Sequence, residues 1–134
     1  MRRLLLASIV AWLWIPAAAQ AGAVQLRVTY ADGAGHHRRG TLTCDGDGPR
    51  ATGFLARRNA AKLCRRAYAL KDFLSSPPDL GRTCTEIYGG PDRARVRGYV
   101  RGSSVDRRFA RTDGCQIADW DRVQRLLPVP AGAG

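Results

Sequence analysis

Four cysteines, Cys44, Cys64, Cys84 and Cys115, are the residues of this chain with the most informative chemistry. They follow one another at 20, 20 and 31 positions, with no Cys-x-x-Cys pair and no histidine near any of them. Structural zinc sites usually take their ligands in close pairs, so we expect no metal. An even number of cysteines in a small exported chain is typical of disulfides. The spacing leaves three pairings open, of which the sequential one is the most local.

A short polar segment, Thr85-Glu86-Ile87-Tyr88, follows the third cysteine and leads into two glycines and a proline. We expect this segment to be extended and exposed, and a disulfide at Cys84 would tie it to the rest of the fold. A protease is blocked by a segment that is exposed, extended and covalently anchored, whereas it digests one that is loose. The segment is therefore a candidate protease-binding loop.

The residue types that catalysis needs are poorly placed in this chain. The only histidines, His36 and His37, are adjacent in a predicted hairpin loop, whereas a nucleophile needs a base that is held rigidly in a cleft. The acidic residues are scattered along the chain without paired placement. We therefore expect no enzyme active site and no cofactor.

Arginine dominates the charge of the chain. There are 22 Lys and Arg residues against 11 Asp and Glu, a net charge of +11, and only Lys62 and Lys71 are lysine. A nucleic-acid site needs such charges to converge with stacking aromatics or a known motif, and Trp120 is the one tryptophan after residue 21. We expect no specific nucleic-acid site, but a solvated basic surface that steers toward acidic partners or cell-wall polymers.

The first 21 residues have the pattern of a secretory signal peptide. Arg2 and Arg3 precede an apolar run over residues 4–15, and cleavage sites follow Ala19 and Ala21. The run is shorter than the ~20 residues that a membrane-spanning helix needs. Removal of the two arginines lowers the net charge from +11 to +9. We predict a signal peptide over 1–21 and one domain over 22–134, secreted to the extracellular space without a membrane segment.

The elements that must position these residues show two periods. Alternation over residues 24–30 and 40–44, with a turn signal between them, predicts a β-hairpin, and 45–49 is predicted as a loop. Over residues 53–68 the apolar positions follow a helical period, with most basic residues on the other face, which predicts the main helix. A further short turn of helix is expected at 72–74.

Alternation is clearest over residues 93–101, where small apolar residues share one face and arginines the other. A returning strand is predicted to begin with Val105, Arg107 and Phe109. The C-terminal segment is ambiguous between a helix and an edge strand. The mixture of periods predicts a single antiparallel α+β domain, with the main helix packed on one face of the sheet.

Several segments of residues 22–134 stand in a characteristic order: Leu26-Arg27-Val28-Thr29, Thr41-Leu42-Thr43-Cys44, a helix with Cys64, Cys84-Thr85-Glu86-Ile87-Tyr88, and Gly98-Tyr99-Val100-Arg101-Gly102 followed by Val105 and Cys115. Together they resemble the Streptomyces subtilisin inhibitor family, the SSI-like inhibitors of subtilase-type proteases. The resemblance implies about five antiparallel strands with helices on one face and a possible homodimer. It also implies disulfides in sequence order, Cys44–Cys64 and Cys84–Cys115.

The same resemblance places the reactive bond between Glu86 and Ile87. The reactive loop that it implies consists of Thr83, Cys84, Thr85, Glu86, Ile87, Tyr88 and Gly89. Asp113 takes the place of an asparagine that supports the loop in the family. Gly89 and Gly90 replace an aspartate before the proline, which should loosen that flank.

The function that the resemblance implies is a secreted standard-mechanism inhibitor of serine endopeptidases. The side chain of Glu86 would enter the primary specificity pocket of the protease. The expected partner is therefore a glutamyl-specific serine protease with a basic pocket, or a subtilisin-like protease. The alternative is a protein of the same fold that does not inhibit and acts as a basic cell-surface or polyanion-binding module.

Overall fold

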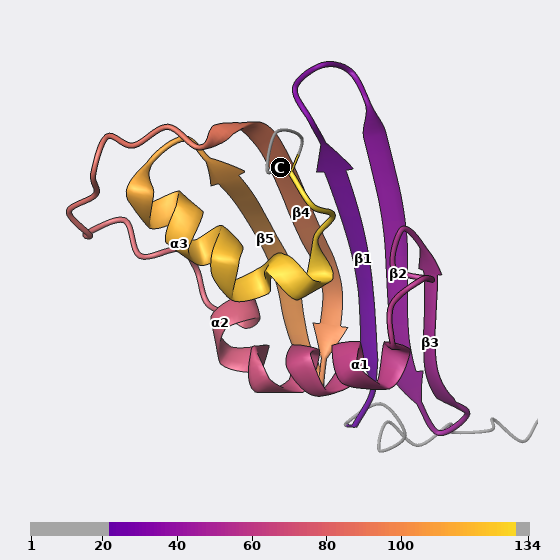
Figure 1. The fold of residues 1–134 in the computed structure, drawn as a ribbon. Helices are drawn as coiled ribbons and strands as arrows, with labels where there is room; N and C mark the ends of the chain where they lie inside the picture. Colours follow the sequence, from indigo (N-terminus) through magenta and orange to yellow (C-terminus); the bar gives the residue numbers. More distant parts are fainter. Residues whose placement is uncertain (1–21, 131–134) are drawn as a thin grey trace, which may run out of the picture.

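Five antiparallel strands form one sheet in the order β3-β2-β1-β4-β5 (Figure 1). The computed structural model describes residues 22–130, and the predicted signal peptide lies outside them. The strands are β1 (Val24–Ala31), β2 (His37–Asp45), β3 (Gly48–Gly53), β4 (Gly90–Val100) and β5 (Ser103–Arg111). The central strand β1 pairs with β2 on one side and with β4 on the other. This last pairing joins the two halves of the chain.

The buried face of the sheet follows the predicted alternation. In β1, Val24, Leu26, Val28 and Tyr30 are buried, and the residues between them are exposed or half-buried. Strand β4 alternates in the same way, with arginines at outer positions. Because successive side chains of a strand point to opposite faces, one face of the sheet is apolar and the other is solvated. The predicted antiparallel α+β fold is confirmed.

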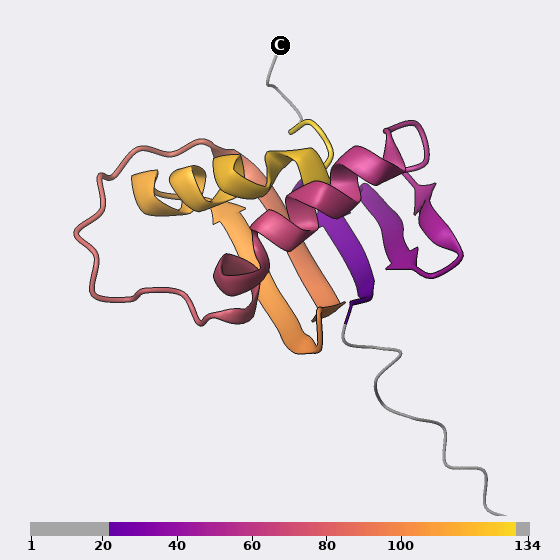
Figure 2. The ribbon, with the colours of Figure 1, turned by 90° about the horizontal axis from the view of Figure 1, so that it is seen from below.

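The helices of the described residues all cover the apolar face of this sheet, as Figure 2 shows. They are α1 (Ala60–Ala69), α2 (Lys71–Ser75), α3 (Gly114–Val123) and a 3-10 turn, η2 (Gln124–Leu126). Trp120 of α3 and Leu63 of α1 are buried against the strands, together with Leu42 and Val96 from the sheet. The predicted short turn of helix at 72–74 is confirmed as part of α2.

The main helix is shorter than the sequence predicts. The predicted range 53–68 is wrong at its start, because α1 begins at Ala60. Gly53 ends β3 with a positive φ of 61°, and the backbone then turns before Asn59. The Asn59 side chain accepts a hydrogen bond from the Lys62 backbone N–H at 2.9 Å and so caps the helix.

A third strand lies where the sequence predicted only a loop. Residues 45–49 were expected to form this loop, but β3 begins at Gly48 and pairs with β2. Gly48 has a φ of 100°, which allows a tight turn after Asp45. Pro49 is tolerated because β3 is an edge strand, where a missing backbone N–H need not break a ladder.

The C-terminal segment adopts the helical alternative. Ile117, Trp120 and Val123 all lie in α3, and Leu126 is buried in η2. After Leu127 the described chain forms no helix or strand. Of the helices in residues 22–130, none combines the length and apolar character needed to cross a membrane.

Candidate functional site

The long connection between α2 and β4 is the most exposed segment of the described chain. Residues 77–89 form no helix or strand and project beyond α3 (Figures 1 and 2). The side chain of Leu80 is 91% exposed, Ile87 is 61% exposed and Tyr88 is 63% exposed. Because three such side chains lie in one short connection, the connection offers apolar contact area to solvent.

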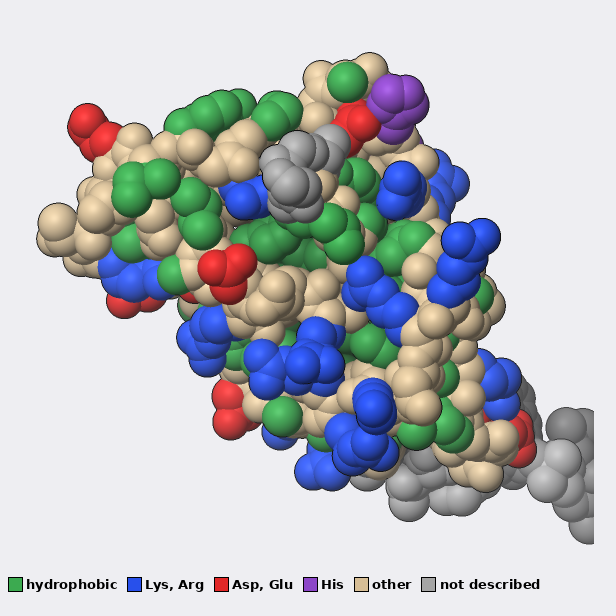
Figure 3. All heavy atoms as spheres, viewed as in Figure 1, with side chains coloured by type: hydrophobic (Ala, Val, Ile, Leu, Met, Phe, Trp, Pro, Cys, Tyr) green, Lys and Arg blue, Asp and Glu red, His purple; other side chains and the backbone are tan. Residues whose placement is uncertain are grey.

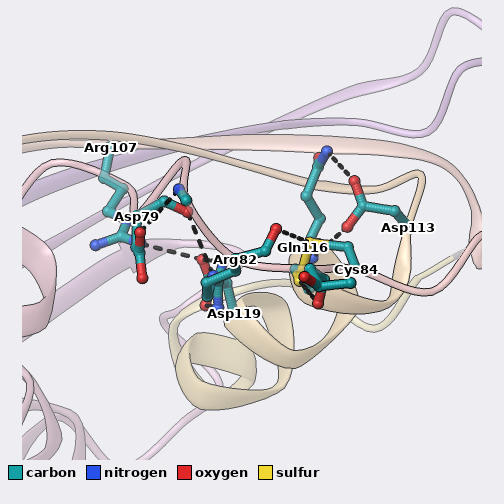
Figure 4. The surroundings of a disulfide bond; sticks show 10 residues. Asp79, Arg82, Cys84, Arg107, Asp113, Gln116 and Asp119 are labelled. Carbon is teal, nitrogen blue, oxygen red and sulfur yellow. Dashed lines mark hydrogen bonds and ion pairs between the residues drawn. A yellow bond between two sulfur atoms is a disulfide. The ribbon is translucent and has the colours of Figure 1, made fainter.

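Two disulfides pair the four cysteines in sequence order, as the resemblance implies. Cys44 in β2 is bonded to Cys64 in α1, with Cα atoms 6.0 Å apart. Cys84 in the connection is bonded to Cys115 in the first turn of α3, with Cα atoms 5.3 Å apart. The second bond, shown in Figure 4, ties the exposed connection to a helix that is packed on the core.

Two backbone hydrogen bonds fix the segment that follows Cys84. The Gly114 N–H donates to the Thr85 carbonyl at 2.9 Å, and the Gly89 N–H donates to the Arg111 carbonyl at 2.7 Å. The flank that the glycines were expected to loosen therefore holds a hydrogen bond. Between these two anchors, residues 86–88 make no backbone hydrogen bond to any described residue.

Glycine lies at both anchors, where the loop and α3 approach each other closely. A Cβ atom at Gly114 would lie 2.0 Å from the Thr85 Oγ1 atom. A Cβ atom at Gly89 would lie 2.9 Å from the Ile117 Cδ1 atom. At such distances the Thr85 hydroxyl and the end of the Ile117 side chain would have to move. Both glycines therefore let the loop pack closely against α3 without displacing these side chains.

A partly buried ion-pair network holds the base of the connection (Figure 4). Arg82 donates two hydrogen bonds to the Asp119 carboxylate, at 3.1 and 3.0 Å, and Arg107 donates a third at 3.1 Å. Arg107 also donates to the backbone carbonyls of Phe73 and Ser76. Such a two-pronged arginine–carboxylate pair fixes orientation as well as distance. One carboxylate therefore links the loop, β5 and α3.

The pKa values of the two arginines bound to this carboxylate are shifted in opposite directions. The hydrogen bonds to Asp119 raise the pKa of Arg82 above its ordinary value. Burial lowers the pKa of Arg107, whose side chain is only 6% exposed. Sequence reasoning missed this network. The signal that could have found it is the place of Arg107 between Val105 and Phe109 on the apolar side of a strand, where a charge needs a partner.

Asp113 caps α3 and does not itself bond to the loop. Its carboxylate accepts hydrogen bonds from the Gln116 backbone N–H at 2.9 Å and from the Gln116 Nε2 atom at 2.7 Å. The backbone hydrogen bond from Gln116 lowers the pKa of Asp113, which is also lowered by the charge of Arg82. Asp113 thus orders the helix turn from which Gly114 and Cys115 hold the loop.

The site has little capacity for metal. Ligand atoms of Cys84, Asp113 and Cys115 lie within 4.8 Å of one another, but the two sulfur atoms form the disulfide and are not available as thiolate ligands. The histidines lie elsewhere, at the β1–β2 hairpin, where the Nδ1 atom of His36 is 2.6 Å from the Asp32 carboxylate.

The described residues form an antiparallel sheet with a helical layer on one face and an exposed loop anchored by a disulfide. No protein-family model and no curated protein matches the chain. The resemblance to the SSI-like inhibitors stays a prediction from the sequence motifs, and the role of the loop is proposed below from its geometry.

Proposed function

We propose that this chain is a secreted standard-mechanism inhibitor of serine endopeptidases, with the reactive bond between Glu86 and Ile87. One observation carries the proposal. Residues 86–88 are exposed and make no backbone hydrogen bonds of their own, while the positions on both sides of them, Thr85 and Gly89, are fixed. Free backbone groups between fixed ends are what an extended inhibitor segment uses to pair with a protease like an added strand.

The anchors explain how such a loop would resist hydrolysis. The serine oxygen of the protease attacks the Glu86 carbonyl carbon, the Glu86–Ile87 bond breaks, and the new amine of Ile87 takes a proton. The amine cannot leave, because Gly89 is hydrogen-bonded to Arg111 and Cys84 is bonded to Cys115. The reverse reaction, in which the amine displaces the serine and restores the peptide bond, then outcompetes attack by water.

Affinity in this scheme comes from the order that already exists in the free protein. Fixing the backbone of one residue costs about 1–2 kcal/mol. The anchors at Thr85, Gly89 and the disulfide already restrict the loop backbone when the protein folds. Less conformational entropy is therefore lost when the loop binds the protease. The exposed side chains of Ile87 and Tyr88 add apolar contact area beside the bond.

Glu86 restricts the choice of protease. A glutamyl-specific enzyme has a basic pocket that can pair with its carboxylate, whereas a subtilisin-like enzyme would have to bury the charge in an apolar pocket. Both remain candidate partners, and the first is electrostatically favoured at this position. The strongly basic remainder of the chain would favour approach to an acidic protease surface.

An inhibition panel with one matched pair of variants tests the proposal. We expect Glu86→Leu to strengthen binding to subtilisin-like proteases by about 2 kcal/mol, or ~30-fold, and to weaken binding to glutamyl-specific proteases. The control Asp121→Leu makes the same chemical change at an exposed position of α3 and should leave both unchanged. If Glu86→Leu changes the inhibition of none of the proteases, the proposed reactive bond is contradicted.

The alternative function is a protein of the same fold that binds polyanions and inhibits nothing. The observation that favours it is the basic surface, which takes no part in the chemistry of the reactive bond. Folded protein that inhibits no member of a panel of subtilisin-like, trypsin-like and glutamyl-specific proteases would support this alternative.

A further inference from the structure

The face of the sheet opposite the helices is a field of arginines. Outward positions in register on β2, β1, β4 and β5 form two neighbouring rows, Thr41-Arg27-Arg97-Asp106 and Arg39-Thr29-Arg95-Arg108. Figure 2 shows that no helix covers this face. Five of these eight residues are arginine, and Asp106 is the one acid among them.

When no ligand is bound, this arrangement of arginines lowers the stability of the folded protein. Arg27 lies directly opposite Arg97, and Arg95 lies directly opposite Arg108. Like charges at directly opposed positions of neighbouring strands are destabilising. Asp106 relieves part of this repulsion, since it accepts two hydrogen bonds from Arg95 at 2.7 Å each. Arg27 and Arg39 have no ion pair with any acid of residues 22–130.

The arginines also enclose space for a ligand. A shallow hollow of about 480 Å³ is lined by Arg27, Thr29, Arg39, Thr41, Arg95 and Arg97. A second hollow of about 590 Å³ shares Arg27, Thr41 and Arg97 with it and continues along the face toward Tyr99 and Ser104. Together they form a shallow path across four strands, in which successive arginines of β4 lie about 7 Å apart along the strand.

We propose that this face binds a linear phosphodiester polymer that carries no bases. Arginine forks bind phosphate oxygens through paired hydrogen bonds. A phosphate presents oxygens in several directions, so guanidinium groups from three strands can reach one group, whereas a planar carboxylate matches a single fork. The ligand would supply negative charge to Arg27 and Arg39, which have no ion pair with an acid of the described residues.

The same observations disfavour two other occupants. A second copy of the chain on this face would bring arginines against arginines. Single-stranded nucleic acid needs aromatic platforms for its bases, and the outward positions of these two rows contain none. Tyr99 is 57% exposed and lines the path one row beyond Arg97, so the path offers one aromatic side chain and not a series of them. This site uses none of the residues of the proposed inhibitory loop, so it stands or falls independently of the inhibitor proposal.

Binding of poly(glycerol phosphate), measured by calorimetry over a range of salt concentrations, tests the site. The double variant Arg27→Gln/Arg97→Gln removes one opposed pair. The slope of log K against log [NaCl] is negative, and each lost contact to a flexible polyanion makes it shallower by about 0.7. We therefore expect the slope to become shallower by about 1.4 and the affinity at 0.1 M salt to fall ~25-fold. The single variant Arg39→Gln should lose ~5-fold.

The matched control removes two charges from the helical side, where Lys and Arg side chains are also abundant (Figure 3). Lys62 and Arg65 are exposed on α1, so Lys62→Gln/Arg65→Gln has the same net charge as the sheet variant. We expect it to lose less than ~3-fold. An equal loss in both double variants would overturn the site, because binding would then follow net charge alone. Equal or tighter binding of oligo-dT or polyglutamate would overturn the proposed ligand. Unchanged protease inhibition by the sheet variants would confirm that the two sites are separate.

Discussion

The two disulfides of this chain each join a helix to another segment, but they lie in different surroundings. Cys44 and Cys64 are 5% and 6% exposed and lie inside the core, where they tie β2 to α1. Cys84 is exposed, and Cys115 is half-buried at the start of α3. The chain-entropy model gives each bond roughly 3–4 kcal/mol of stabilisation, because the closed loops are of similar length. Their surroundings separate them, since one bond supports the core and the other supports the shape of a loop.

Removal of the loop disulfide should have the largest effect on function. In Cys84→Ser/Cys115→Ser, residues 86–88 are expected to become mobile, and fixing each of them again costs about 1–2 kcal/mol. We expect inhibition to weaken by roughly 1,000-fold, or about 4 kcal/mol. Mass spectrometry after incubation with the inhibited protease should show cleavage between Glu86 and Ile87. A variant that stays intact and inhibitory would show that the disulfide does not anchor the loop.

Removal of the core disulfide should lower the stability of the protein and leave inhibition nearly unchanged. We expect Cys44→Ala/Cys64→Ala to lower the free energy of unfolding by about 3 kcal/mol, measured by urea denaturation. Inhibition should change little at temperatures at which the variant is folded, because the contacts of the loop with α3 and β5 are not touched. If both double variants lose inhibition equally, the two bonds are not specialised.

The ion-pair network offers a smaller, non-covalent version of the same comparison. Asp119→Asn leaves Arg107 buried with two carbonyl partners but without its carboxylate. We expect the free energy of unfolding to fall by about 2 kcal/mol and inhibition to weaken as Arg82 releases the base of the loop. The control Asp106→Asn breaks an exposed ion pair with Arg95 and should have a far smaller effect on stability.

The pH dependence of stability gives the smallest predicted effect. The pKa of Asp113 is lowered in the folded state from its ordinary value of 3.8. As the pH falls below that value, the unfolded state therefore binds the proton first and the folded state loses stability. Asp113→Asn keeps a capping oxygen but has no such proton. We expect the wild type to be more stable than the variant at pH 7 and to lose this difference in stability below about pH 4, as measured by thermal unfolding from pH 7 to pH 2.5. A constant difference between the two would contradict this role.

The strands were predicted largely because their burial follows the sequence pattern. Val24, Leu26, Val28 and Tyr30 alternate in β1, and no long-range information is needed to see it. Strand β3 was not predicted because Gly48 and Pro49 have low strand propensity. They are tolerated because β3 is an edge strand, which is a property of the whole sheet and not of the local sequence. The helix start was misplaced because the capping role of Asn59 competes with the helical period of the residues before it.

The candidate loop was visible in the sequence, but its supports were not. The four cysteines mark the two bonds, and the SSI-like motifs implied their pairing. The hydrogen bonds of Thr85 and Gly89 are made to residues more than 20 positions away, and no local pattern indicates them. Arg82 and Asp119 are separated by 37 positions, so their pairing emerges only when α3 packs on the sheet.

The position of Arg107 also bears on how the protein behaves in concentrated solution. Strand β5 is an outer edge of the sheet, where unpaired backbone groups could accept a strand from another molecule. An inward-pointing charge on an edge strand discourages this, because a chain added beside β5 would have to leave the buried contacts of Arg107 with Asp119, Phe73 and Ser76 intact. Pro49 interrupts the donor pattern on the opposite edge, in β3. The sheet is thus guarded at both edges against growth into fibrils.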